Sequence, residues 1–576
     1  MQNNTLERPT PSTAPAPCVA GAASAEASPS LPLAPVALGS AALLAACGGG
    51  GGGGGDSAAS APAPVPPVAA PISAAEASRF LGQAGFGGTD AQISRVQALG
   101  YSGWLDEQFA APRTQGHYDW MVEKGYAAAA NINSFSGTDN TLWRKLISSP
   151  DVLRQRITLA LSEVFVVSMT GLPINWRGFV AAAYMDVLEA NAFGTYRTLL
   201  GEVTLSPGMG SYLNMRGNLR EDAATGRVPD ENYAREVLQL FSLGLVELAA
   251  NGTLKNGVAT DTYGQDTITG LAKVFTGWNN NAANNTEPGH AQRPMVLTAA
   301  NHSPSAKQFL GVTIAASTPG AAALQTALDT IAAHPNVGPF IGRQLIQRLV
   351  TSQPSPTYVG RVAAVFNNNG SGVRGDLAAV VRAILLDSEA RNAPDASFGK
   401  LREPVLRVAQ WMRAMGARSA SGQYAMAFEL DSSSERVLNA NSVFGYFRPG
   451  YVPPGTVFSA SGSTVPEFQI VNESTVAAWL NTAESMAGTG LGWNGTGNDV
   501  SADYAALAQL VATGNLSMVI DHLNVLLLGG RMSAGLRQAI QDAVGSVVGS
   551  GATSDLYRAR AAVFMTLASP EYLVQQ

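Results

Sequence analysis

The sequence predicts a mainly α fold: a large irregular all-helical domain of many short helices with long Gly/Asn/Pro-rich loops and few short strands. Three observations support this prediction. Apolar residues recur at the spacing of one helix face, most clearly within residues 230–244. Residues that cap helices precede such stretches, and glycines follow them. Stretches with the character of strands are short, as at residues 295–297 and 307–313.

The helix expected within residues 230–244 shows these signals together. Its apolar residues fall at i, i+4, i+7 and i+8, and they are Tyr233, Val237, Leu240 and Phe241. Asp230 stands at the N-cap position, because its carboxylate can accept hydrogen bonds from free N–H groups of the first turn. Gly244 is placed to end or bend the helix, since glycine enters the left-handed conformation without steric cost.

Further helices are expected on both sides of this stretch. Ser73 and Glu76 form a capping box that starts the first one. Residues 151–167 predict a longer helix that points Arg154 and Arg156 outward. Later helices are expected at residues 196–205, 324–333, 337–350, 358–366, 376–387, 401–415, 472–487, 504–512, 516–527, 534–548 and 557–568. Residues 441–466, where aromatic residues alternate with Gly and Pro, predict an ordered loop packed on the helical body.

Composition excludes several classes of function. The chain has 576 residues and a net charge of -6 without a cluster of Lys and Arg, which argues against nucleic acid as a partner. Both cysteines, Cys18 and Cys47, precede the folded region, and no two of the five histidines stand four residues apart. The sequence has no nucleophile elbow, no Walker A sequence, and no dinucleotide-binding Gly-x-Gly-x-x-Gly fingerprint that follows a strand. We therefore expect no metal and no cofactor.

The N-terminal region predicts how the protein is held in the cell. An apolar run ends in Leu44-Ala-Ala-Cys47, which resembles the bacterial lipoprotein signal, in which cleavage before the cysteine makes it the lipidated N-terminus. We expect a lipoprotein signal peptide-like segment at residues 1–46, a Gly/Ala/Pro-rich flexible tether at 47–71 and a helical body at 72–576. The protein is thus expected to be exported and lipid-anchored in the cell envelope, at the periplasmic face or the surface of the outer membrane.

Ordered motifs along the body resemble a known family. They are Glu231-Asn-Tyr-Ala-Arg-Glu236 with Leu240 to Gly244, Gln265-Asp266, Thr276-Gly-Trp278, His302, Lys307 to Gly311, His334-Pro335, Phe340 to Arg343, Phe398 to Pro404, Phe447-Arg-Pro449, Pro466 to Gln469 and Ser569 to Tyr572. This set is similar to the bacterial family called domain of unknown function 1800. The resemblance implies an exported, mainly helical, uncharacterised protein. It also implies a possible partner, a sulfatase-like protein of the family called domain of unknown function 1501.

The resemblance also supplies a candidate site. For catalysis it offers Glu236 as general acid or base, His302 as a second proton carrier, and Asp266. For binding it offers Asn232, Arg235, Gln265, Trp278, Lys307, Arg343, Arg402, Glu403, Arg448 and Glu467. Carboxylates, cations and a tryptophan face, if they converge, suit an anionic or hydroxylated polysaccharide of the envelope. One hypothesis is therefore a carboxylate-based hydrolase or lyase.

A second hypothesis assigns these residues to structure, as buried ion pairs and caps that position short helices. The protein would then bind or help assemble or export an extracellular polymer, or bind the sulfatase-like partner, and we favour this interpretation. Other single residues have simpler expectations. Three histidines are expected at the surface, His117, His290 and His522, and four tryptophans in the core, Trp104, Trp143, Trp411 and Trp479.

Overall fold

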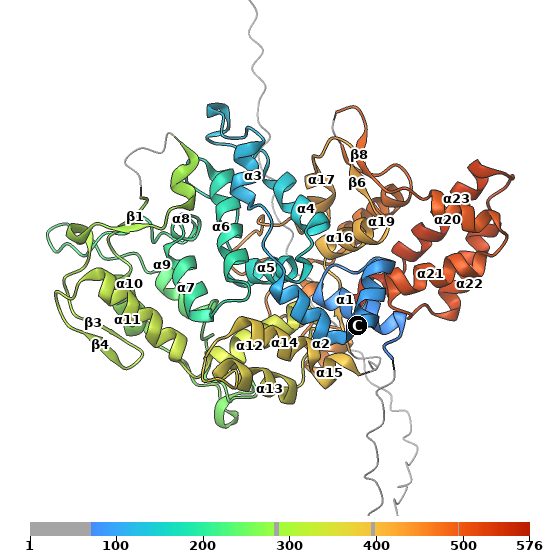
Figure 1. The fold of residues 1–576 in the computed structure, drawn as a ribbon. Coiled ribbons are helices and arrows are strands. Elements are labelled where there is room, and N and C mark those ends of the chain that lie inside the picture. Colours follow the sequence, from blue (N-terminus) through green and yellow to red (C-terminus); the bar gives the residue numbers. More distant parts are fainter. Residues whose placement is uncertain (1–70, 282–286, 393–397, 494) are drawn as a thin grey trace, which may run out of the picture. The chain divides into compact units, whose positions relative to one another are not determined.

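Helices dominate the structure, a computed structural model that describes residues 71–281, 287–392, 398–493 and 495–576 (Figure 1). The chain divides into two units, Met1–Val68 and Ala69–Gln576. The expected segments 1–46 and 47–71, apart from Pro71, lie outside the described residues, and so does Cys47. Within the described residues no helix is both long enough and apolar enough to span a membrane.

The described residues form 24 α-helices, so the prediction of a mainly α fold is confirmed. The first twelve are α1 (Ala74–Ala84), α2 (Asp90–Ala110), α3 (His117–Glu123), α4 (Thr138–Ser148), α5 (Val152–Val164), α6 (Arg177–Asn191), α7 (Tyr196–Leu205), α8 (Pro207–Tyr212), α9 (Asn232–Gln239), α10 (Gln265–Val274), α11 (Gly320–Ala333) and α12 (Val337–Leu349). The others are α13 (Pro356–Asn367), α14 (Leu377–Leu386), α15 (Ser388–Arg391), α16 (Pro404–Ala414), α17 (Ala427–Ser432), α18 (Val457–Ser461), α19 (Glu473–Ala487), α20 (Ala505–Ala512), α21 (Leu516–Leu528), α22 (Ala534–Gly545), α23 (Ala552–Leu567) and α24 (Pro570–Leu573).

Helix α5 lies at the centre of the packing, in contact with α2, α4, α6 and α12 (Figure 1). All of its residues are buried, including the charged ones. The prediction that Arg154 and Arg156 point outward is therefore wrong, since their exposed fractions are 9% and 0%. A helix of this composition normally leaves one polar face in water. Here neighbouring helices cover that face as well, so its charges must find partners inside the protein.

The helix-capping signals of the sequence are confirmed where they were clearest. Ser73 and Glu76 form the expected capping box at α1, and Thr89 caps α2 in the same way. Helix α9 is shorter than its apolar pattern predicts, and its N-cap is Glu231 and not Asp230 as expected. The Asp230 carboxylate accepts a hydrogen bond of 2.8 Å from the Asn232 N–H, and the helix ends at Gln239. Gly244 follows in a left-handed conformation at φ +74°.

The strands are short and pair in small antiparallel sheets. They are β1 (Trp278–Asn279), β2 (Val296–Leu297), β3 (Lys307–Phe309), β4 (Val312–Ile314), β5 (Lys400–Leu401), β6 (Arg418–Ser419), β7 (Leu491–Trp493), β8 (Asn498–Ser501) and β9 (Val574–Gln575). Residues 307–313, expected as one strand, form the hairpin β3–β4 instead. Strand β5 pairs with β9, so Lys400 lies opposite Gln575.

The expected loop at 441–466 is irregular apart from α18, and it packs on the helical body. The four tryptophans expected in the core, Trp104, Trp143, Trp411 and Trp479, are buried. Two of the three histidines expected at the surface are buried instead, His117 and His290, with exposed fractions of 1% and 2%. His117 is the first residue of α3, and it faces the interior because this helix packs on α4 and α6. His522 is partly exposed.

Candidate functional site

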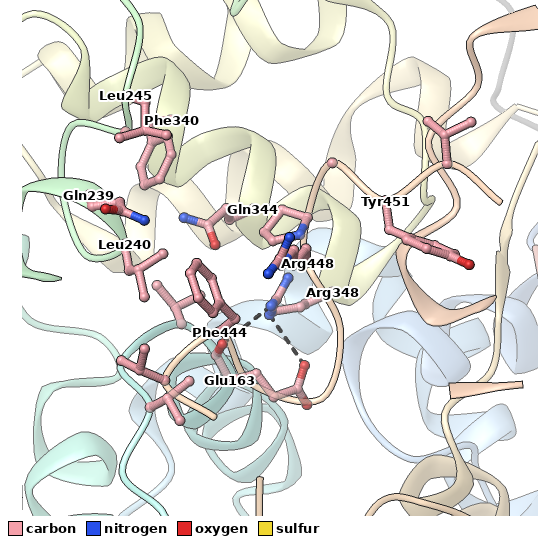
Figure 2. A pocket seen from close by; sticks show the side chains of 17 residues that line it. Glu163, Gln239, Leu240, Leu245, Phe340, Gln344, Arg348, Phe444, Arg448 and Tyr451 are labelled. Carbon is pink, nitrogen blue, oxygen red and sulfur yellow. Dashed lines mark hydrogen bonds and ion pairs between the residues drawn. The ribbon is translucent and has the colours of Figure 1, made fainter. Parts of the chain in front are cut away.

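A cavity of about 610 Å³ opens where α5, α9 and α12 meet the loop at 443–452 (Figure 2). Helix α12 contributes one face to it. Phe340, Gln344 and Arg348 follow one another at intervals of four residues, so that a ring, an amide and a guanidinium group point into the same space. The rest of the wall consists of Glu163, Val164, Val166, Gln239, Leu240, Gly244, Leu245, Val443, Phe444, Arg448, Pro449, Gly450, Tyr451 and Val452.

Gly244 allows the chain beyond α9 to approach α12 closely. The N–H groups of Leu243 and Gly244 both bond to the Leu238 carbonyl, at 2.8 and 3.0 Å, and this closes the end of the helix. A Cβ atom at Gly244 would lie 2.7 Å from the Phe340 ring. The positive φ and this contact together require glycine, and they bring Gln239 and Leu240 to the cavity wall.

The loop at 443–452 supplies the opposite wall. The Gln347 Nε2 group on α12 donates to the Pro449 carbonyl at 3.0 Å, and the Arg448 N–H donates to Gln469 Oε1 at 2.8 Å. The guanidinium of Arg448 stacks over the Phe444 ring at 4.6 Å. These contacts hold an aromatic ring and a cation in place without regular backbone pairing, as a binding loop requires.

Arg348 is the most strongly held charge of the cavity. Its Nε lies 3.2 Å from Glu163 Oε2, and its Nη2 donates to the Glu163 carbonyl at 3.2 Å. Its Nη1 has no hydrogen-bond partner among the described residues, and neither has Nε2 of Gln344. Both side chains are buried, with exposed fractions of 2% and 5%. Buried donors are normally satisfied, so these two are available to a ligand.

Behind Arg348 lies a group of buried charges that we call the cavity cluster. Its members are Arg156, Glu163, Arg348, Lys400, Glu403, Glu435 and Glu467. One carboxylate oxygen from each of Glu163, Glu403 and Glu435 lies within 4.8 Å of the other two. Lys400 Nζ donates to Glu403 and lies 3.2 Å from Glu467.

A backbone carbonyl at the end of α12 also binds two cations of the cavity cluster. The Arg348 carbonyl accepts a hydrogen bond of 3.1 Å from Lys400 Nζ and a second one from Arg156 Nη2. Carbonyl groups in the last turn of a helix carry partial negative charge, which favours cations there. This explains why Arg156 is buried on α5.

Protonation in the cavity cluster is set by burial and by the neighbouring charges. Burial, and then the charge of Glu403, raises the pKa of Glu163 to about 8. Burial and the charges of Glu403 and Glu163 raise the pKa of Glu435 well above its usual range. For Glu403 burial favours the neutral acid, but Lys400 and Arg156 outweigh it and lower the pKa. At neutral pH Glu403 is thus charged, while Glu163 keeps its proton.

Two groups of side chains have the composition of a metal site. One is Glu163, Glu403 and Glu435, and the other is His117, Asp186 and Glu189. In each group a lysine ammonium already lies against a carboxylate. Lys400 bonds Glu403, and Lys145 Nζ lies 2.7 Å from both oxygens of Glu189. We assign no metal to either group.

The candidate residues taken from the sequence do not line one cleft. Only Arg448 lines the cavity, while Glu403 and Glu467 lie behind it in the cavity cluster. Arg402 is buried against Tyr572, with Nη1 donating to its carbonyl at 2.6 Å. Arg343 is on α12 but does not contribute to the cavity wall, and burial lowers its pKa.

The other candidates lie in two places. Near α9 and α10 are Asn232, Arg235, Glu236, Gln265 and Asp266, and around β1 to β3 are Trp278, His302 and Lys307. Burial raises the pKa of Glu236, and its Oε2 has no hydrogen-bond partner among the described residues. His302 Nδ1 lies 3.0 Å from the Thr276 carbonyl, and Lys307 Nζ donates to the Ser303 carbonyl at 2.9 Å.

Sequence reasoning missed Glu163, Gln344, Arg348 and Glu435. A signal was present for the first of them, because Arg156 and Glu163 interrupt a stretch whose other residues are mostly apolar. The repeat of four residues from Phe340 to Arg348 was a second signal.

Comparison with known proteins identifies the family of this chain but not its function. No curated protein and no solved structure matches the chain. The family described as "Protein of unknown function (DUF1800)" matches residues 79–574, which include the cavity and the whole cavity cluster. The chain therefore belongs to the DUF1800 family.

Proposed function

We propose that this protein binds a segment of an extracellular polysaccharide in the cavity between α9, α12 and the loop at 443–452. The observation that carries the proposal is the Gln344 amide, which is buried without a partner inside a space walled by aromatic rings. Figure 2 shows the amides of Gln239 and Gln344 pointing toward each other across this space.

The chemistry of the wall suits a sugar. Phe340 and Phe444 offer ring faces for the apolar face of a pyranose, and the amides can bond its hydroxyl groups (Figure 2). The volume of about 610 Å³ lies within the range of small-molecule sites. A polymer could enter, since the cavity is open and Leu245 at its edge is 56% exposed.

The cellular setting is part of the same proposal. The Cys47 motif and the glycine run after it support an exported protein that a lipid holds in the envelope, where it would meet such a polymer at the outer membrane. Assembly or export of the polymer, and contact with a sulfatase-like protein of the domain of unknown function 1501 family, remain proposals that rest on the family resemblance.

Binding is favoured here over a carboxylate-based hydrolase or lyase. The carboxylates proposed for catalysis, Glu236 and Asp266, do not line the cavity, and neither does His302. Glu163 does line it, but its carboxylate is engaged with Arg348.

The test uses the full chain carrying Cys47→Ser and a panel of neutral and acidic bacterial polysaccharides. We expect binding without chain shortening, and Phe444→Ala should weaken it about tenfold through the loss of one stacking contact. Phe428→Ala is the matched control, because Phe428 is 81% exposed and is not part of the cavity wall. Equal loss in both variants would count against the cavity, and shortening of the polymer would favour the enzyme.

A further inference from the structure

Two arginines line the cavity, and among the described residues neither has an ion-pair partner that is charged at neutral pH. Arg348 pairs with Glu163, which holds a proton there because burial and Glu403 raise its pKa to about 8. The guanidinium of Arg448 stacks on Phe444 and has no ion-pair partner among the described residues. In Figure 2 Arg348 lies between Glu163 and Arg448. Two adjacent cations of this kind suit an anionic ligand.

We infer that the cavity selects an anionic sugar, one bearing a carboxylate or sulfate group, which Arg348 and Arg448 bind. This inference rests on the proposed function, and it names the class of sugar. Arg348 Nη1 is the donor that points to such a group, since it is buried, unpartnered within the described structure and part of the cavity wall.

The alternative of a cationic ligand does not fit the wall. Of the described residues that line the cavity, Glu163 is the one acid, and its Oε2 faces Arg348 at 3.2 Å. A cation would have to approach two guanidinium groups to reach it. An anion instead meets donors first, with the Gln344 amide beside them.

The proton linkage depends on the charges that surround Glu163 from each neighbouring element. These are Arg156 on α5, Arg348 on α12, Lys400 on β5, Glu403 before α16, Glu435 after α17, and Tyr446 in the loop. The charge of Arg348 stabilises the ionised form of Glu163. A bound anion offsets that charge, so binding favours the protonated form of Glu163 further. Above pH 8 the free protein must therefore take up a proton to bind, and affinity falls by up to about tenfold per pH unit.

The experiment measures affinity by calorimetry with the full chain carrying Cys47→Ser and two matched pairs of polymers. One pair is polygalacturonate and its carboxyl-reduced form, and the other is dextran sulfate and dextran. We expect at least one charged member to bind about tenfold more tightly than its neutral partner at pH 7, and the pair that responds identifies carboxylate or sulfate.

Substitutions test which residues are responsible for the preference for the charged polymer. Arg448→Gln should remove most of the preference for the charged polymer, and Arg220→Gln should not, since Arg220 is also exposed but is not part of the cavity wall. Arg448 is a surface residue, so this variant tests the inference even if substitutions of buried Arg348 fail to fold. Glu163→Gln should give the same affinity at pH 7 and pH 9, where the unmodified residue should give a fall of about tenfold.

Three results would overturn the inference. Equal affinity for the charged and neutral members of both pairs would reject the anionic sugar while leaving polysaccharide binding in place. An unchanged preference in Arg448→Gln would reject the arginine site. Absence of binding to any polymer would reject the proposed function and this inference together.

Discussion

Two buried clusters of charge in this protein look alike in composition but differ in how completely they are paired. The α6 cluster, which joins α3, α4 and α6, consists of Arg113, His117, Lys145, Asp186 and Glu189. In it Lys145 Nζ lies 2.7 Å from both oxygens of Glu189, and Arg113 lies 3.3 Å from one of them. Asp186 accepts the N–H groups of His117 and Tyr118 at 2.7 and 2.9 Å.

The cavity cluster is paired less completely. Among the described residues, neither oxygen of Glu163 accepts a hydrogen bond, and Nη1 of both Arg156 and Arg348 lacks an acceptor. Burial alone therefore does not distinguish a ligand site from a structural one. The difference lies in how many donors and acceptors stay uncommitted, since in the α6 cluster Nε2 of His117 is the one such atom among the described residues.

The largest expected effect is on the α6 cluster. Lys145→Met removes the ammonium group that satisfies Glu189 and leaves its buried carboxylate with two more distant partners, Arg113 at 3.3 Å and His117 at 3.8 Å. We expect a loss of about 3–5 kcal/mol in the free energy of unfolding, measured by urea denaturation. Polysaccharide binding should persist in the molecules that remain folded. A loss below about 1 kcal/mol would show that this pair is not the structural element we describe.

The effect of Glu163→Gln in the cavity cluster should depend on pH, and over any one pH unit it should be smaller than that of Lys145→Met. The pKa of Glu163 is raised to about 8 in the folded protein, above its usual value of 4.5. Its contribution to stability is therefore fully present below pH 4.5 and is lost as the pH rises through 8. The free energy of unfolding should fall with pH, by at most about 1.4 kcal/mol per unit for this group, more steeply in the unmodified protein than in Glu163→Gln. Parallel pH profiles would contradict the assignment.

The smallest effect is expected for an exposed pair, which sets the baseline for both clusters. Arg235 Nη2 lies 3.4 Å from Glu231 Oε2 on α9, and both side chains are partly exposed. Arg235→Gln should change the free energy of unfolding by less than about 1 kcal/mol, because water screens such pairs. Thermal unfolding at low and high salt is the measurement. A loss as large as that of Lys145→Met would mean that the exposure of an ion pair does not predict its contribution to the free energy of unfolding.

The sequence predicted the fold well because helices are encoded locally. The capping box of Ser73 and Glu76 and the apolar face of α9 involve residues a few positions apart. The site was harder to predict, since its pairs are distant in sequence. Arg156 reaches the carbonyl of Arg348, 192 residues away, and nothing near Arg156 indicates that α12 covers its face of α5.

Pairing of β5 with β9 has a consequence for how the protein is made. Gln575 lies opposite Lys400 in this pair, and its Nε2 donates to the Leu349 carbonyl at 2.6 Å, directly after Arg348. The end of α12 and the cation that holds it thus depend on a strand that is synthesised after both of them. While the chain is still emerging from the ribosome, Leu349 and Lys400 lack these contacts until residues 574–575 have been made.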